Sequence, residues 1–160
     1  MQELIGIAEQ IAARLVERKQ TIAVAESSTG GVISAALLAV PGASRYFKGS
    51  AVVYTRDARR ILMDIPDEAM RGIRASSEVY ARLLAEQIRG RFGSDFGLSE
   101  TGATGPIGNR YGDAAGHCCM AVAGERTTAI TLETGSSERV GNMRVFAKTA
   151  LELLLKNLER

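Results

Sequence analysis

The chain has 160 residues, 46% of them hydrophobic, and a formal net charge of only +2 at pH 7. This length and hydrophobic content suit one substantial core, so we expect a single domain over residues 1–160. The small net charge argues against nucleic acid as a partner, and the lack of a signal peptide or of an apolar run approaching about 20 residues predicts a cytoplasmic protein that does not bind membranes.

The first half of the chain predicts helices that alternate with strands. Residues 3–19 carry apolar side chains at three- and four-residue spacing, which is typical of an amphipathic helix. Residues 21–25 are apolar and partly β-branched, which predicts a buried strand, and the alanine-rich run 32–40 predicts the next helix. Residues 47–54 form a second candidate strand, after which Thr55 is a suitable cap for a short arginine-rich helix.

The second half of the chain departs from strict alternation after one more helix and strand. That strand leads into a long glycine-dense loop, and such loops are usually functional or disordered. Because an antiparallel hairpin follows, we predict an α/β fold of three layers (α/β/α), with a mixed, mostly parallel sheet of five strands. The predicted elements are a helix that begins at Ser76 or Ser77 and ends at 90–93, a strand over 95–100, the loop over 101–116, strands over 117–123 and 127–133, and a last helix capped by Ser136 or Ser137.

Few residues suit metal binding or thiol chemistry. Cys118 and Cys119 are adjacent and would point to opposite faces of a strand, which indicates neither a disulfide framework nor a metal site. The only histidine, His117, has no second histidine or acid at ligand spacing, which favours a structural role. The sequence therefore predicts no metal site.

The segment Glu26–Gly31, which we call the glycine-rich junction, reads Glu-Ser-Ser-Thr-Gly-Gly between a predicted strand and helix. Such a junction offers backbone N–H groups, hydroxyl donors and the positive end of a helix dipole to an anion. The Glu26 carboxylate would repel a phosphate, so we expect it to orient hydroxyls or to contact a neutral part of the ligand. Alternatively, Ser28 or Thr29 only caps the helix. Because ligands gather beyond the carboxyl ends of parallel strands, the junction and residues 101–106 are expected to converge.

Four motifs follow one another along the chain: Ala-Glu-Ser-Ser-Thr-Gly-Gly at 25–31, Pro-Gly-x-Ser at 41–44, Tyr54 with a basic residue five positions later, and Thr-Gly-x-x-Gly-Pro at 101–106. Together they resemble the C-terminal domain family of the competence/damage-inducible protein CinA, which includes stand-alone nicotinamide mononucleotide amidases. The resemblance covers nearly the whole chain. It implies a self-associating amidohydrolase of pyridine nucleotide salvage that needs neither a cofactor nor a metal and converts nicotinamide mononucleotide to nicotinate mononucleotide and ammonia.

The resemblance also implies roles for single residues. The catalytic residues would be Ser44 as nucleophile, Tyr54, and Arg59 at the position of the family's active-site lysine. Taken alone, Ser44 is equally typical of a turn and Tyr54 of a strand end. Arg144 on the last predicted helix is a further candidate for contacting a phosphate. The other substrate-binding residues would be Glu26, Ser27, Ser28, Thr29, Gly30, Gly31, Thr101, Gly102, Gly105 and Pro106.

Arg59 departs from the family pattern. A buried lysine can lose its proton and act as a general base, whereas a guanidinium stays charged in proteins. Three roles for Arg59 therefore stay open. In the first, it stabilises negative charge during hydrolysis while another group, such as Tyr54 or Lys48, accepts the proton. In the second, it binds a phosphorylated ligand that is not turned over. In the third, it is a solvated surface residue. Ser28 in place of the usual cysteine and Thr104 in place of alanine are further departures.

The sequence thus favours an amidohydrolase whose substrate is a small phosphorylated nucleotide and whose chains form a homo-oligomer. The alternative is a nucleotide-binding domain that senses a phosphorylated metabolite without catalysis. A third class, an interaction module for DNA-uptake or repair proteins, is suggested only by the family name and finds no basic patch in the sequence.

Overall fold

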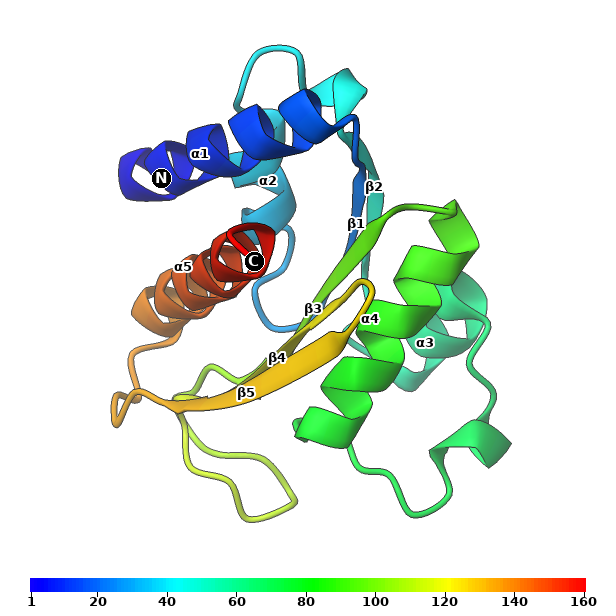
Figure 1. The fold of residues 1–160 in the computed structure, drawn as a ribbon. Helices are drawn as coiled ribbons and strands as arrows, with labels where there is room; N and C mark the ends of the chain where they lie inside the picture. The colour runs from blue at the N-terminus through cyan, green and yellow to red at the C-terminus, as the bar shows by residue number, and fades with distance from the viewer.

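Five strands form one sheet in the computed structural model of the chain, which describes all 160 residues (Figure 1). The strands are β1 (Ile22–Glu26), β2 (Phe47–Val52), β3 (Phe96–Ala103), β4 (His117–Ala123) and β5 (Thr127–Glu133). They lie in the order β2-β1-β3-β4-β5. β1 pairs in parallel with β2 and β3, whereas the β3–β4 and β4–β5 pairs are antiparallel. The sheet is mixed, as predicted, and its parallel part is confined to the first three strands of the chain.

Helices cover both faces of the sheet, which confirms the three-layered fold (Figure 1). One face carries α1 (Gln2–Arg18), α2 (Val32–Leu38) and α5 (Arg139–Leu158), and the other carries α3 (Arg56–Met63) and α4 (Glu78–Phe92). The larger hydrophobic core lies under α1, α2 and α5 and includes Ile11, Leu37 and Phe146. A smaller core under α3 and α4 includes Met63 and Leu84. Two short 3-10 helices, η1 (Ala43–Arg45) and η2 (Asp67–Met70), lie in the connections.

Side-chain caps that the sequence predicted mark the beginnings of α3 and α4. The side chains of Thr55 and Ser77 each accept a hydrogen bond from the backbone N–H three residues later, at 3.1 and 3.2 Å, as predicted for both N-caps. α5 differs, because its cap is Glu138 rather than either preceding serine. Ser136 instead accepts a hydrogen bond from the Glu138 N–H at 3.1 Å, and so it orders the turn before the helix.

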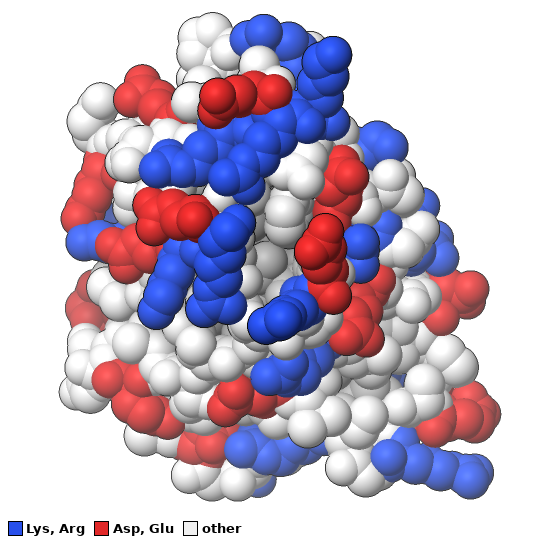
Figure 2. Space-filling model, viewed as in Figure 1, with Lys and Arg blue, Asp and Glu red and all other residues white.

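The surface drawn in Figure 2 carries both positive and negative side chains, with positive ones gathered near the top of the view and the two signs interspersed elsewhere. This pattern agrees with the small net charge of +2. None of the helices is both long and apolar enough to cross a bilayer.

The parallel pairing of β1, β2 and β3 places their carboxyl ends at one edge of the sheet. β3 continues to Ala103, beyond the predicted end at residue 100, so the long loop begins at residue 104. This edge is therefore where the glycine-rich junction, the start of α3 and the long loop meet.

Candidate functional site

A pocket of about 680 Å³ lies at this edge of the sheet. A volume of this size suits a small-molecule ligand. The pocket is lined by five of the residues that the sequence singled out, namely Ser27, Tyr54, Arg59, Thr101 and Gly102. These residues come from segments far apart in the sequence, and the predicted convergence of the glycine-rich junction with the end of β3 is confirmed.

The donors at the start of α2 are occupied by Glu26. Its fully buried carboxylate accepts hydrogen bonds from the backbone N–H groups of Gly31, Ile33 and Ser34 at 3.1, 2.9 and 2.9 Å. It also accepts hydrogen bonds from the hydroxyls of Thr29, at 2.8 Å, and of Ser34. Glu26 therefore orients hydroxyls, as predicted. The predicted anion cradle, however, is already filled by the protein's own carboxylate.

Glu100 on β3 occupies the other half of the glycine-rich junction. Its buried carboxylate accepts hydrogen bonds from the N–H groups of Ser27 and Thr29 at 2.9 and 3.0 Å, and from the hydroxyls of Ser28 and Thr29. By contrast, the Ser27 hydroxyl has no hydrogen-bond partner in the chain, and Ser27 lines the pocket. Sequence reasoning missed Glu100, although an acid inside a buried strand was an available signal.

Gly30, Gly31 and Gly105 shape the backbone and do not line the pocket, whereas Gly102 is part of its lining. Gly30 and Gly31 have φ angles of 61° and 102°, a region that favours glycine. At Gly105, an added Cβ would lie 2.6 Å from the Ser137 carbonyl oxygen, so only glycine permits this close approach. Pro106 is exposed beyond it.

Ser44 lies at the amino end of β2, away from the pocket at the carboxyl ends of the parallel strands. It is exposed in η1, which precedes β2, whereas Tyr54 follows the end of the same strand. A strand of six residues extends about 20 Å, so the structure does not bring Ser44 and Tyr54 together within one chain. Lys48 also lies outside the pocket, because its Nζ donates hydrogen bonds to carbonyl groups at the end of α4, at 3.1 and 3.4 Å.

Arg59 is buried in the pocket wall. Its side chain donates a hydrogen bond from Nε to the Ile65 carbonyl at 3.3 Å, and its guanidinium pairs with Asp67. Of the three roles left open for Arg59, that of a solvated surface residue is therefore excluded. Burial raises the pKa of Tyr80 in the same wall, and the positive charge of Arg59 opposes this shift. Since a guanidinium does not lose its proton, Arg59 supplies fixed positive charge and cannot act as a base.

Tyr54 lies on the pocket rim, with 60% of its surface exposed. Its hydroxyl accepts a hydrogen bond from Arg139 at 3.3 Å, and Arg139 also donates to the Gly105 carbonyl. The start of α5 is thereby tied to the rim. Arg144, one turn further along α5, is exposed and lines a separate pocket of about 290 Å³ beside Lys148.

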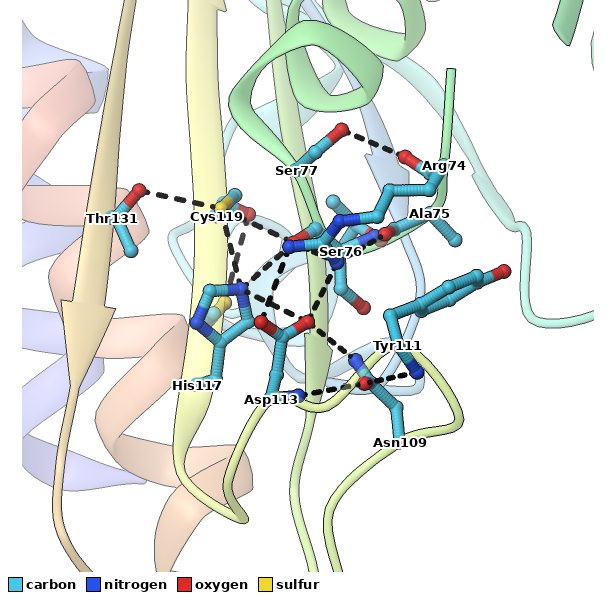
Figure 3. Close-up of polar contacts among 12 residues, drawn as sticks. Arg74, Ala75, Ser76, Ser77, Asn109, Tyr111, Asp113, His117, Cys119 and Thr131 are labelled. Atoms are coloured by element: carbon cyan, nitrogen blue, oxygen red, sulfur yellow. Dashed lines mark hydrogen bonds and ion pairs between the residues drawn. The ribbon is translucent and has the colours of Figure 1, made fainter. Parts of the chain in front are cut away.

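The long loop is anchored by a network around Asp113 (Figure 3). Arg74 donates two hydrogen bonds to the Asp113 carboxylate at 2.6 and 3.2 Å, and Asn109 donates a third at 2.8 Å. Burial would raise the pKa of Asp113, but these hydrogen bonds and the charge of His117 lower it. The loop is therefore held against the segment before α4 by charged contacts.

His117 lies at the centre of the same network. Its Nε2 is 2.7 Å from the Ser76 carbonyl oxygen and its Nδ1 contacts the Glu133 carboxylate. Burial alone would lower the pKa of His117, but the contacts with Glu133, Ser76 and Asp113 raise it. His117 is thus a buried residue whose ring nitrogens both have partners, in agreement with the predicted structural role.

The two cysteines face opposite sides of β4, as predicted. Cys118 lies in the larger core, and Cys119 lies in a small separate cluster of alanines between β4 and α4. Burial raises the pKa of both thiols. The chain has no group of three or more His, Cys, Asp or Glu side chains arranged to hold a metal ion.

Comparisons with known proteins agree with this architecture. The sequence model of the CinA C-terminal domain matches residues 5–158. A CinA-like protein of Gloeobacter violaceus is 40% identical over 95% of the chain, and one of Acidobacterium capsulatum is 36% identical over 94% of it. The chain spans 36% of the length of each of these relatives.

Solved structures show the same fold. A CinA superfamily protein from Klebsiella pneumoniae matches with a TM-score of 0.91 at 22% identity, covering 98% of both chains. The competence/damage inducible protein CihA from Agrobacterium tumefaciens matches with a TM-score of 0.90 at 26% identity, covering 99% of this chain and 96% of its own.

Proposed function

Since the chain belongs to the CinA C-terminal domain family, we propose that it hydrolyses the carboxamide of nicotinamide mononucleotide, with Ser27 as the nucleophile. The observation that carries this proposal is the meeting of an unpaired serine hydroxyl, Tyr54 and buried positive charge in one pocket. The positive charge of the pocket suits a phosphorylated substrate, because guanidinium groups bind phosphate strongly.

Ser27 takes the place of Ser44 in this proposal for a geometric reason. A serine nucleophile must lie within reach of a proton acceptor and of groups that stabilise the oxyanion. Ser27 shares a pocket with Tyr54 and Arg59, whereas Ser44 is exposed at the amino end of β2. The neighbouring hydroxyls of Ser28 and Thr29 are hydrogen-bonded to buried carboxylates, so Ser27 has the one free hydroxyl of the glycine-rich junction.

The reaction proceeds through an acyl-enzyme. Ser27 Oγ forms a bond to the carboxamide carbon while its proton passes to Tyr54, which must act as the phenolate and whose oxygen is held by the Arg139 guanidinium. The tetrahedral oxyanion collapses, and the proton returns to the departing nitrogen, which leaves as ammonia. Water then attacks the ester carbon, releasing nicotinate mononucleotide and restoring Ser27 and Tyr54. Arg59 contributes positive charge, which favours the oxyanion.

The second candidate function is binding of a phosphorylated nucleotide without turnover. It is favoured by Arg59, which is buried and paired with Asp67 where the family carries a lysine. Because a guanidinium stays charged, the pocket lacks an amine that could act as a general base.

The test is ammonia release from nicotinamide mononucleotide by the purified chain and its variants. We expect Ser27→Ala to lower kcat at least about 100-fold and the matched control Ser44→Ala to change it less than about twofold. The reverse order would overturn the choice of nucleophile. If the parent releases no ammonia at high enzyme concentration while Arg59→Lys does, the amidase proposal fails for this chain and the binding function replaces it.

A further inference from the structure

The glycine-rich junction leaves an anionic ligand with few backbone donors. Glu26 accepts hydrogen bonds from the N–H groups of Gly31, Ile33 and Ser34, and Glu100 accepts them from Ser27 and Thr29. These two buried carboxylates also repel a phosphate placed beside them. The positive partner of an anion must therefore come from elsewhere in the pocket.

The pocket wall supplies four arginines, which differ in their partners. Arg59 is paired with Asp67, and Arg74 is paired with Asp113. Arg56 and Arg110 line the same pocket and form no ion pair with any carboxylate. Two guanidinium groups of the pocket thus have their charge available for a ligand.

Arg110 is held in place by an aromatic contact. Its guanidinium lies 5.1 Å from the centre of the Tyr111 ring and donates a hydrogen bond to the Tyr111 hydroxyl at 3.0 Å. Arg74 lies 5.3 Å from the centre of the same ring and is fixed by Asp113 (Figure 3). We call Arg74, Arg110 and Tyr111 the loop wall. Stacking of this kind orients a guanidinium and leaves its N–H edge free to bind.

We propose that Arg56 and Arg110 form the subsite for the phosphate monoester of a mononucleotide, with Tyr111, Arg74 and Asp113 positioning Arg110. This inference rests on the proposed function in one respect, that the other end of the ligand reaches Ser27. A phosphate monoester carries close to two negative charges near neutral pH, which two unpaired guanidinium groups match.

The test measures binding without turnover. Nicotinate mononucleotide and nicotinate riboside differ only in the phosphate, and neither has an amide to hydrolyse. By titration calorimetry, we expect Arg56→Gln and Arg110→Gln each to weaken binding of the mononucleotide about tenfold and to leave binding of the riboside unchanged. Arg126→Gln is the matched control, because Arg126 is exposed in the β4–β5 turn and lines no pocket described here; it should change neither affinity.

The proposed subsite is contradicted if both arginine variants bind the mononucleotide as well as the parent does, or if the parent does not bind it. It is also contradicted if both variants bind the mononucleotide and the riboside more weakly by the same factor. The proposed amidase fails separately. Preferential binding of the mononucleotide that depends on Arg56 and Arg110, without ammonia release from the amide, would retain the subsite and reject the hydrolase. Hydrolysis with an unchanged KM in both arginine variants would retain the hydrolase and reject the subsite.

Discussion

The glycine-rich junction and the loop wall are both polar and both lie at the edge of the sheet where the parallel strands have their carboxyl ends, but they differ in how their charges are satisfied. In the junction, the backbone donors and the hydroxyls of Ser28 and Thr29 are bound to Glu26 and Glu100 inside the protein. In the loop wall, Arg74 is neutralised, while Arg110 keeps a free charge at the pocket. A polar group is available to a ligand only where the fold leaves it unpaired.

The largest expected effect comes from breaking the junction at Glu100. Glu100→Ala removes the acceptor for two N–H groups and two hydroxyls, all close to or within the protein interior. Since unpaired buried polar groups cost about 1–3 kcal/mol each, we expect the free energy of unfolding to fall by about 3–5 kcal/mol in urea titrations. Glu125→Ala, in the exposed β4–β5 turn, is the control and should change it by less than about 0.5 kcal/mol. A loss of similar size in both variants would contradict the structural role of Glu100.

A substitution in the network that supports the loop wall should change the affinity for the mononucleotide more than the stability of the fold. Asp113→Asn removes the charge that fixes Arg74, whose side chain is 41% exposed, so the loss of stability should stay within about 1 kcal/mol. Binding of nicotinate mononucleotide should weaken about fivefold, because Tyr111 and Arg110 lose their support. Urea titration and calorimetry on the same preparation separate the two effects. An unchanged affinity would show that Arg110 does not depend on this network.

A pH titration tests how His117 holds the loop wall. Because the folded-state pKa of His117 is raised, its stabilising contribution is complete below the unfolded value of about 6.5 and is lost as the pH rises through the folded value. The unfolding midpoint of the parent should therefore fall with rising pH in that window. His117→Gln cannot titrate and should show a flatter profile. Parallel profiles for the two proteins would be the contrary result.

The smallest expected effect is that of salt. Raising NaCl from about 0.05 to about 0.5 M shortens the screening length from about 14 to about 4 Å, which should weaken mononucleotide binding about threefold. The double variant Arg56→Gln with Arg110→Gln should lose most of this dependence, because its pocket lacks the exposed unpaired charges. The buried contacts of Glu26 and Glu100 are screened less, so stability should change little. Calorimetry at both salt concentrations checks this expectation, and an equal salt dependence in parent and double variant would argue against it.

The helices and strands and their order could be predicted from local sequence patterns. The amphipathic period of the helices, the apolar strands and the caps at Thr55 and Ser77 are local properties, and each reappears in the structure. The meeting of the glycine-rich junction with the end of β3 also followed from sequence, because parallel strands present their carboxyl ends at one edge.

Which polar groups stay unpaired depends on the folded arrangement and could not be predicted from the sequence. Whether Ser27 or Ser44 shares a pocket with Tyr54 depends on which end of β2 each segment reaches. Likewise, the pairing of Glu100 with the junction joins residues more than 70 positions apart, and no local pattern encodes it. Secondary structure follows from neighbours along the chain, whereas charge pairing and burial depend on neighbours in space, which only the folded arrangement supplies.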